Sequence, residues 1–146
     1  MTQDVRVLKS LDEIKNLSFR NEDILACNVL GLSEVPMIRA CFEMSRENFI
    51  VSFDGNPVCI WGHRPEDRKT SIWMFTTKEV DNYKLAFAKE SRRLVRAILT
   101  EFDSIEALVH CSHEVSIKWL YWLGFKEKLK LRHGNEFFFV VQKDKV

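Results

Sequence analysis

Apolar positions in the first third of the chain alternate with polar ones or recur at helical spacing, and they predict one strand followed by three helices. Val5 and Val7 alternate with polar neighbours, as in a short strand. The segment Ser10–Glu13 has the spacing of a capping box and predicts the start of a helix. Helical spacing predicts a second helix over Asn21–Leu30 and a third around Val35–Met44.

The middle of the chain has the pattern of a hairpin, a central strand and a long helix. The alternating stretch Phe49–Gly62, with Asp54-Gly55 as its turn, predicts the hairpin. The polar segment His63–Lys69 contains a proline and predicts a loop. Ser71–Thr76 predicts a central strand, and Tyr83–Phe102 predicts an amphipathic helix with one apolar face.

The last third predicts a strand, a helix and a second hairpin. Ile105–Val109 is apolar enough for a buried strand, and Ser112 suits the N-cap of the helix that follows. Gly124 suits the left-handed residue that ends this helix. The final hairpin is expected to pair Lys128–Leu131 with Phe137–Val141.

Composition favours one compact protein without a strong overall charge. The chain has 146 residues with 46% hydrophobic content, and no linker or repeat interrupts it, so we expect a single domain over residues 1–146. Its 22 basic and 21 acidic residues give no field that would recruit nucleic acid or a membrane surface. Residues 1–6 lack the apolar region of a signal peptide, and no apolar run approaches the roughly 20 residues that span a bilayer. We therefore expect a cytoplasmic location.

The cysteines are scattered along the chain. Cys27, Cys41, Cys59 and Cys111 form none of the close pairs that metal knuckles or thioredoxin-like sites use. We expect free thiols that pack as small hydrophobic side chains, and no metal site.

A run of polar residues, His110-Cys111-Ser112-His113-Glu114, follows the predicted strand Ile105–Val109. The carboxyl ends of strands are where α/β sheets tend to hold ligands, and this run offers base, nucleophile and acid types. Two interpretations are open. Ser112 and Glu114 can cap the helix and complement its dipole, or Cys111 can act as a nucleophile beside a histidine.

Two further sets of residues have alternative interpretations. One face of the long helix carries four basic residues, Lys89, Arg92, Arg93 and Arg96. This basic stripe is either solvated or contacts the phosphates of nucleic acid or of coenzyme A (CoA). The tryptophans are expected in the core, and any that remains exposed would mark a partner interface. They are Trp61, Trp73, Trp119 and Trp122.

The strand-helix unit that ends in Leu123-Gly124-Phe125 resembles the corresponding unit of the GNAT superfamily, the Gcn5-related N-acetyltransferases. The order of the predicted elements is similar to the GNAT order across nearly the whole chain. The resemblance implies an α/β (α+β) fold, in which helices flank a central, mixed, mostly antiparallel twisted sheet.

The resemblance also implies an acetyl-CoA site between the central strand and the long helix. Members of the superfamily usually carry glycines there, because backbone amides must approach the pyrophosphate closely. The corresponding junction, residues 76–84, contains no glycine, and the carboxylates of Glu79 and Asp81 would repel a phosphate. If this site is used, the cofactor-binding candidates are Thr77, Lys78, Asn82 and Lys84.

GNAT enzymes commonly use a tyrosine four residues before the glycine of the Leu-Gly-Phe run as the acid that protonates the thiolate. Leu120 stands at that position, and Tyr121 lies one residue later, about 100° around a helix. No catalytic tyrosine is therefore carried over. If the chain is an enzyme, Tyr121 and His113 are the candidates for proton transfer.

A narrower resemblance rests on the segments Trp73–Thr77 and Ser116–Leu120 before Leu123-Gly124-Phe125. They are similar to segments of small GNAT-like internal virion proteins of short-tailed phages. This resemblance implies a protein of the infected cell's cytosol or of the virion, which binds phage or host proteins in virion assembly and has a degenerate acyl-CoA site. The alternative is an active N-acyltransferase that uses acetyl-CoA on a protein or small-molecule amine. A homo-oligomer is compatible with both.

Overall fold

The computed structural model describes residues 1–146, and the chain divides into two compact units. The first unit comprises Met1–Arg64 and Trp73–Phe87, and the second comprises Pro65–Ile72 and Ala88–Val146. The expectation of a single domain stays a prediction.

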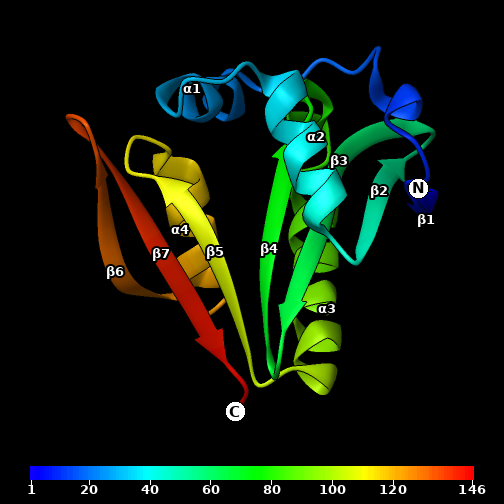
Figure 1. Cartoon of the computed structure of the whole chain (residues 1–146). Coiled ribbons are helices and arrows are strands. Elements are labelled where there is room, and N and C mark those ends of the chain that lie inside the picture. The colour runs from blue at the N-terminus through cyan, green and yellow to red at the C-terminus, as the bar shows by residue number, and fades with distance from the viewer. The chain divides into compact units, whose positions relative to one another are not determined.

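The elements follow one another in the order drawn in Figure 1. The strands are β1 (Gln3–Val7), β2 (Glu47–Phe53), β3 (Asn56–Glu66), β4 (Lys69–Thr76), β5 (Ser104–His110), β6 (Lys126–His133) and β7 (Glu136–Asp144). The α-helices are α1 (Asn21–Val29), α2 (Glu34–Met44), α3 (Lys84–Glu101) and α4 (Glu114–Trp122). Two short 3-10 helices are η1 (Leu11–Ile14) and η2 (Lys78–Asn82).

The strands form a mixed sheet in the order β1-β2-β3-β4-β5-β7-β6. β4 pairs with β5 in parallel, whereas β1–β2, β2–β3, β5–β7 and β6–β7 are antiparallel pairs. This arrangement confirms the expected fold class, and it confirms that the strand ending at Thr76 is central.

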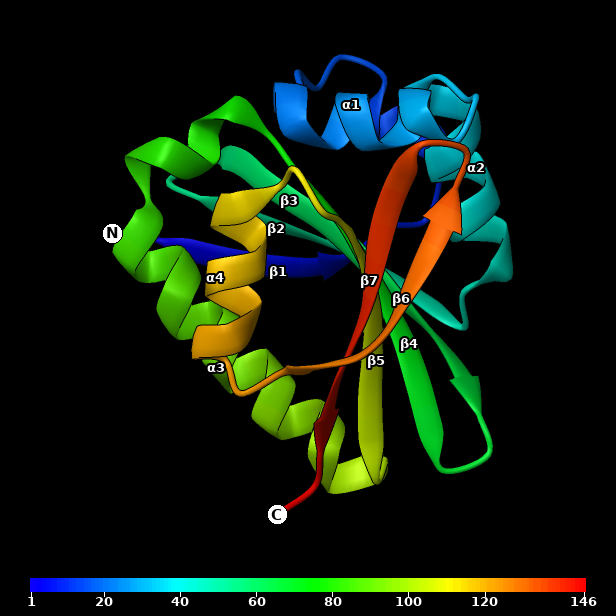
Figure 2. The ribbon, with the colours of Figure 1, turned by 90° about the vertical axis from the view of Figure 1, so that its left-hand side faces the viewer.

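The first unit is built on the antiparallel strands β1, β2 and β3, which lie side by side in Figure 2. Its core joins apolar residues of β2 and β3 with others from η1, α1, α2 and β4, and with one residue from each of the connections that precede η1 and α1. They are Leu8, Ile14, Phe19, Cys27, Ile38, Ile50, Ile60 and Phe75. Ser10 and Glu13 form the expected capping box, although the helix that they cap is a single 3-10 turn.

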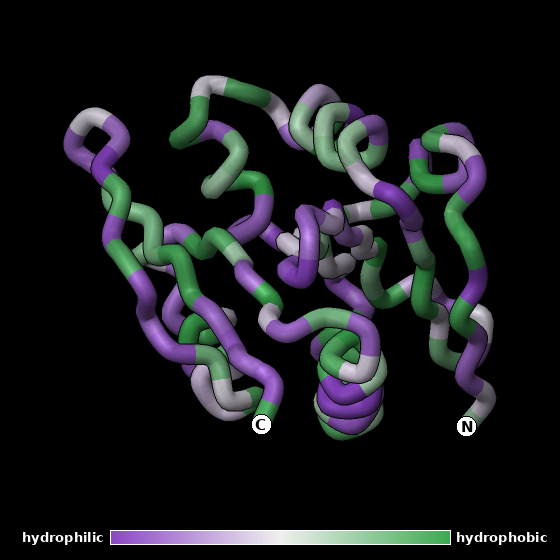
Figure 3. The backbone as a smooth tube through the Cα atoms, turned by 60° about the horizontal axis from the view of Figure 1, so that its bottom comes forward, coloured by the Kyte–Doolittle hydropathy of each residue, from purple (hydrophilic) through white to green (hydrophobic).

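The second unit is built on β5, β7 and β6, which Figure 1 shows side by side. The apolar face of α3 supplies Val95, Ile98 and Leu99 to the core, while its other face is polar, as the alternating colours of the tube in Figure 3 show. Ile105 and Val141 contribute fully buried side chains from β5 and β7. This unit thus combines two helices with an antiparallel three-stranded ladder.

Two expectations about secondary structure were wrong. The predicted loop His63–Lys69 is mostly strand, because β3 continues to Glu66 and β4 begins at Lys69, with a tight turn between them. Asp67 has a φ of 56° in this turn. Ser112 is not the N-cap of α4, because His113 takes that position.

The other helices, strands and hairpins lie where the sequence predicts them, within about two residues at most ends. Gly124 has a φ of 101° after α4, as expected for the residue that ends the helix.

No single helix is long and apolar enough to cross a membrane, and the pair α1 and α2 meets the length and composition test only across a bend of 82°.

Candidate functional site

The junction between β4 and α3 is the place where the resemblance puts a phosphate cradle. β4 ends at Thr76, Thr77 caps η2, and α3 begins at Lys84. The connection is therefore a closed 3-10 turn of five residues rather than an open loop.

Most of the amides around this turn are already hydrogen-bonded inside the protein. The donor–acceptor pairs are Thr77 N to Val58 O (2.8 Å), Lys78 N to Ser18 O (3.1 Å), Glu79 N to Thr77 Oγ1 (3.2 Å), Val80 N to Thr77 O (3.2 Å) and Tyr83 N to Val80 O (3.0 Å). A phosphate cradle needs amides that point at the anion. These five amides point at protein acceptors instead.

The side chains predicted to bind a cofactor have different roles in this turn. Thr77 is buried, and its hydroxyl donates to the Pro57 carbonyl oxygen at 2.7 Å. The Asn82 side chain donates to the Glu79 carboxylate at 3.2 Å. Lys78 and Lys84 are exposed. The structure thus leaves the two lysines accessible and uses the other two residues to close the turn.

The first turn of α3 differs from η2 in charge. η2 carries Glu79 and Asp81, whereas the first turn of α3 has no acidic residue and begins with Lys84. The first intrahelical bond runs from Phe87 N to Tyr83 O at 2.8 Å, so the preceding amides of α3 are orphan donors of the helix terminus. An anion is electrostatically favoured at this end of α3.

The residues of α4 follow the orientation that the sequence predicts. Leu120 is 5% exposed and packs inward, whereas Tyr121 is 46% exposed. His113 is buried, and its Nε2 lies 3.1 Å from Ser116 Oγ. His113 therefore contacts Ser116 within α4, and Tyr121 lies at the surface.

A different group of polar side chains meets at the carboxyl end of β5. His110 Nδ1 lies 2.6 Å from Ser112 Oγ, and His110 Nε2 lies 3.0 Å from Glu136 Oε2. The Ser112 backbone N–H also points at Nδ1, at 3.3 Å. His110 is buried and packs edge-on against Phe138, so its ring is fixed between two polar partners.

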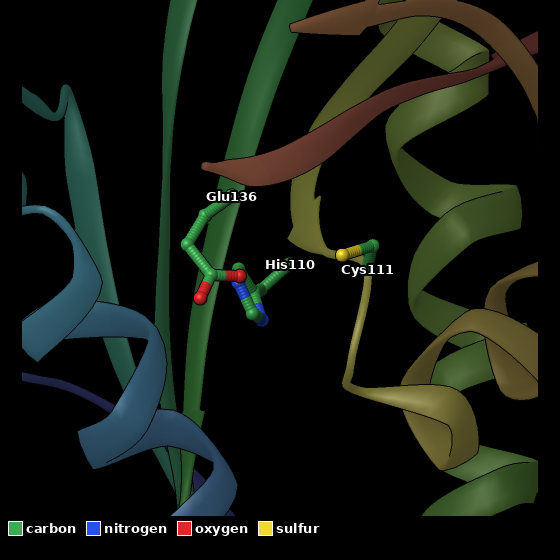
Figure 4. Close-up of side chains that lie close together, drawn as sticks. All are labelled: His110, Cys111 and Glu136. Carbon is green, nitrogen blue, oxygen red and sulfur yellow. The ribbon is translucent and has the colours of Figure 1, made fainter. Parts of the chain in front are cut away.

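Cys111 belongs to the same group. Its sulfur, a ring nitrogen of His110 and a carboxylate oxygen of Glu136 all lie within 4.8 Å of one another. Figure 4 shows the Glu136 carboxylate beside the His110 ring and the Cys111 sulfur directed toward the same space. Sequence reasoning singled out His110 and Cys111 but missed Glu136, because it lies 26 residues from His110 and becomes a neighbour only through the register of β5 and β7.

The outer face of α3 and α4 carries a third feature. The Arg92 guanidinium lies over the Trp122 ring, 4.4 Å from its centroid, and Trp122 is 50% exposed. Arg93 hydrogen-bonds to the buried Glu90, and this bond raises the pKa of the Arg93 guanidinium. Trp61 is buried in the core as predicted, whereas the expectation of a core position was wrong for Trp122.

Comparisons with solved structures find the same architecture over nearly the whole chain. The ribosomal-protein-S18-alanine N-acetyltransferase of Escherichia coli is 14% identical with a TM-score of 0.70, and the match covers 99% of this chain and 94% of that one. An acetyltransferase of Bacillus subtilis in complex with CoA is 11% identical with a TM-score of 0.72, covering 99% and 100% of the two chains. The spermidine N-acetyltransferase of Vibrio cholerae, in complex with CoA and spermine, is 14% identical with a TM-score of 0.70, covering 98% and 95%.

The fold is the GNAT acetyltransferase fold. The identities are low, so the likeness establishes architecture and not activity. No protein-family model matches the sequence, and no curated protein matches it. The narrower resemblance to phage internal virion proteins stays a prediction, as do the assigned roles of Tyr121, His113 and the four cofactor-binding candidates.

Proposed function

We propose that this GNAT-fold protein acts by binding another protein through the exposed faces of α3 and α4, and not by acyl transfer. The observation that carries the proposal is the half-exposed Trp122 with Arg92 stacked over it. Large aromatic side chains are normally covered in a protein that works alone, and Trp and Arg are enriched among the residues that dominate binding energy.

Neighbouring residues extend this surface. Val115 and Tyr121 of α4 are also exposed, so α4 offers apolar and aromatic side chains on its outer side. Tyr121 can lend both a ring and a hydroxyl to a contact. We call Arg92, Val115, Tyr121 and Trp122 the α3–α4 surface.

The charge beside this surface indicates what kind of partner fits it. Lys89, Arg92, Arg93 and Arg96 are all exposed on α3. Charge complementarity then favours an acidic protein surface with an apolar pocket for Trp122. Mutation of the basic residues should mainly slow association and weaken its dependence on salt.

The β4–α3 junction supports the non-catalytic part of the proposal. Its amides from Thr77 to Val80 are bonded within the protein, and Glu79 and Asp81 add negative charge beside them. A bound pyrophosphate would have to break those bonds and would meet like charge. The finer role that we propose, on the phage resemblance, is that of an internal virion or assembly protein whose partners are phage or host proteins.

Quantitative capture from phage-infected cells tests the proposal. We expect the wild-type chain to retain a defined virion or assembly protein, and Trp122→Ala to lose it by tenfold or more. Leu25→Ala is the matched control, because Leu25 is an equally exposed apolar residue on α1. Equal retention by both variants, or recovery of no phage protein by the wild-type chain, would overturn the proposal.

A second candidate function is acyl-CoA-dependent N-acyltransfer. The observation that favours it is the start of α3, where Lys84 accompanies orphan amides and no acidic residue. The fold neighbours from Bacillus subtilis and Vibrio cholerae are described in complex with CoA. In this function Lys84 would hold phosphate, and Tyr121 or His113 would transfer the proton.

Isothermal titration with CoA and acetyl-CoA separates the two functions. The binding function predicts no saturable heat at millimolar ligand, whereas an enzyme should bind in the micromolar range. If binding occurs, Lys84→Ala should weaken it more than Lys78→Ala, since Lys78 begins the acidic turn η2. Micromolar affinity for CoA, weakened more by Lys84→Ala than by Lys78→Ala, would favour N-acyltransfer over the protein-binding function.

A further inference from the structure

The group at the carboxyl end of β5 combines three kinds of metal ligand. A buried imidazole, a partly buried thiol and a carboxylate come together from His110, Cys111 and Glu136, with their ligand atoms within 4.8 Å of one another. Neither proposed function uses this group. An imidazole nitrogen, a thiolate sulfur and a carboxylate oxygen are the three protein ligand types that zinc accepts.

We propose that His110, Cys111 and Glu136 form a zinc-binding site. Three protein ligands leave the fourth tetrahedral position for water, which is the open form of a zinc site. One thiolate and one carboxylate together balance the charge of Zn²⁺. The sulfur ligand disfavours Mg²⁺ and Ca²⁺, which take oxygen ligands.

The distances suit this assignment. Nitrogen and oxygen ligands lie about 2.0–2.2 Å from zinc, so two of them in tetrahedral geometry are about 3.4 Å apart. His110 Nε2 and Glu136 Oε2 are 3.0 Å apart, so only a small separation is needed to admit the ion between them. The Glu136 side chain is 49% exposed and can make this adjustment at the surface.

The backbone already holds the ligands in place. His110 of β5 lies opposite Phe138 of β7, so these two side chains are on the same face of the sheet. Glu136 is two residues before Phe138 on β7 and therefore shares that face with His110. Cys111 N donates to Phe137 O at 3.0 Å, which fixes the residue after β5 against β7. Ligands on paired strands are positioned more firmly than ligands on free loops.

Ser112 supplies the outer contact that a zinc-bound histidine requires. With Nε2 on the metal, Nδ1 carries the proton and can donate it to Ser112 Oγ, which already lies 2.6 Å away. The N–H of the Ser112 backbone then turns away from Nδ1. Such outer partners orient the ring, and their loss typically weakens metal binding by about 10- to 100-fold.

Cobalt titration of the reduced, metal-free full chain tests the site. Co²⁺ accepts the same ligand types as zinc and reports a bound thiolate through a near-ultraviolet charge-transfer band. We expect this band and visible d–d bands to saturate at one equivalent, and zinc to displace them. Cys111→Ser should abolish the charge-transfer band, whereas the matched control Cys41→Ser should retain it.

Substitutions at two exposed positions, Glu136 and Ser112, test metal binding without disturbing the folded structure. Glu136→Gln changes an exposed side chain, and we expect it to weaken cobalt binding at least tenfold with an unchanged far-ultraviolet circular dichroism spectrum. Ser112→Ala should weaken binding about 10- to 100-fold. No charge-transfer band at one equivalent, or a band that survives in Cys111→Ser, would overturn the proposal. Selective labelling of Ser112 by a fluorophosphonate without any cobalt band would instead assign the group to a serine nucleophile.

Discussion

The hydroxyl of Thr77 donates a 2.7 Å hydrogen bond to the carbonyl oxygen of Pro57, and the Thr77 hydroxyl oxygen accepts from the backbone amide of Glu79 at 3.2 Å. One buried threonine thus ties the end of β4 to the start of β3 and caps η2. Where the resemblance implies an acyl-CoA cradle, the chain thus forms a turn whose backbone amides donate to acceptors within the protein.

Thr77→Val should destabilise the protein by about 1–2 kcal/mol, because it removes a cap and leaves a carbonyl and an amide without their partner. Urea unfolding of the purified variant measures this loss. Thr77→Ser is the control, since it keeps the hydroxyl and should retain most of the stability. Equal stability of the valine variant and the wild type would show that the hydroxyl contributes nothing.

Adjacent residues of α4 should respond very differently to truncation. Leu120→Ala should cost about 2–4 kcal/mol, because Leu120 is 5% exposed and its loss leaves a cavity. Tyr121→Ala should change the free energy of unfolding by no more than about 0.5 kcal/mol, because Tyr121 is half-exposed. Thermal and urea unfolding of both variants checks this contrast. Similar losses for the two would mean that α4 is rotated from the orientation described above.

The carboxylate of Glu106 gives the second unit a stability that depends on pH. Lys128 and Lys69 lie 2.5 and 3.2 Å from its Oε1, and the hydrogen bond from Lys128 is the largest cause of a lowered Glu106 pKa. Because the Glu106 pKa is lowered in the folded state, the ionised carboxylate contributes fully to the free energy of unfolding above the ordinary pKa of 4.5. This contribution is lost as the pH falls through the lowered pKa.

We therefore expect Glu106→Gln to be less stable than the wild type at pH 7, by up to about 1 kcal/mol, because both lysines are partly exposed and solvent screens the pairs. The difference should shrink as the pH falls below about 4.5. Urea unfolding across this range measures it. Glu127→Gln, on the exposed strand β6, is the control and should show no such trend. A difference that stays constant with pH would contradict the ion-pair explanation.

Most of the fold could be predicted from the sequence because its signals are local. The capping box of Ser10 and Glu13, the turn at Asp54-Gly55 and the left-handed Gly124 each depend on neighbours in the chain. The error at His63–Lys69 has a physical reason. The far end of β3 carries exposed polar residues and Pro65, so its composition is that of a loop although its backbone is extended.

The candidate sites were less predictable, because they depend on distant pairings. His110 meets Glu136 only through the β5–β7 ladder, and Trp122 meets Arg92 only through the approach of two helices. Nothing in the local sequence gives either pairing. The prediction of Ser112 as the N-cap was wrong for a similar reason. The Ser112 hydroxyl hydrogen-bonds to His110, and the direction of the His110 side chain cannot be read from the sequence.

Cys27 should react slowly with iodoacetamide in the folded protein. Its side chain is buried at 3% exposure, and burial is the largest cause of a thiol pKa raised to about 11. The thiolate is the reactive form, so at pH 8 only about one thiol in a thousand would be available even where the reagent reaches it. Mass spectrometry of time-resolved labelling should therefore find Cys27 unmodified long after the urea-unfolded chain has reacted completely. Labelling at equal rates in the folded and unfolded chains would mean that α1 opens readily and that the core around Ile38 and Phe19 is not the stable centre of the first unit.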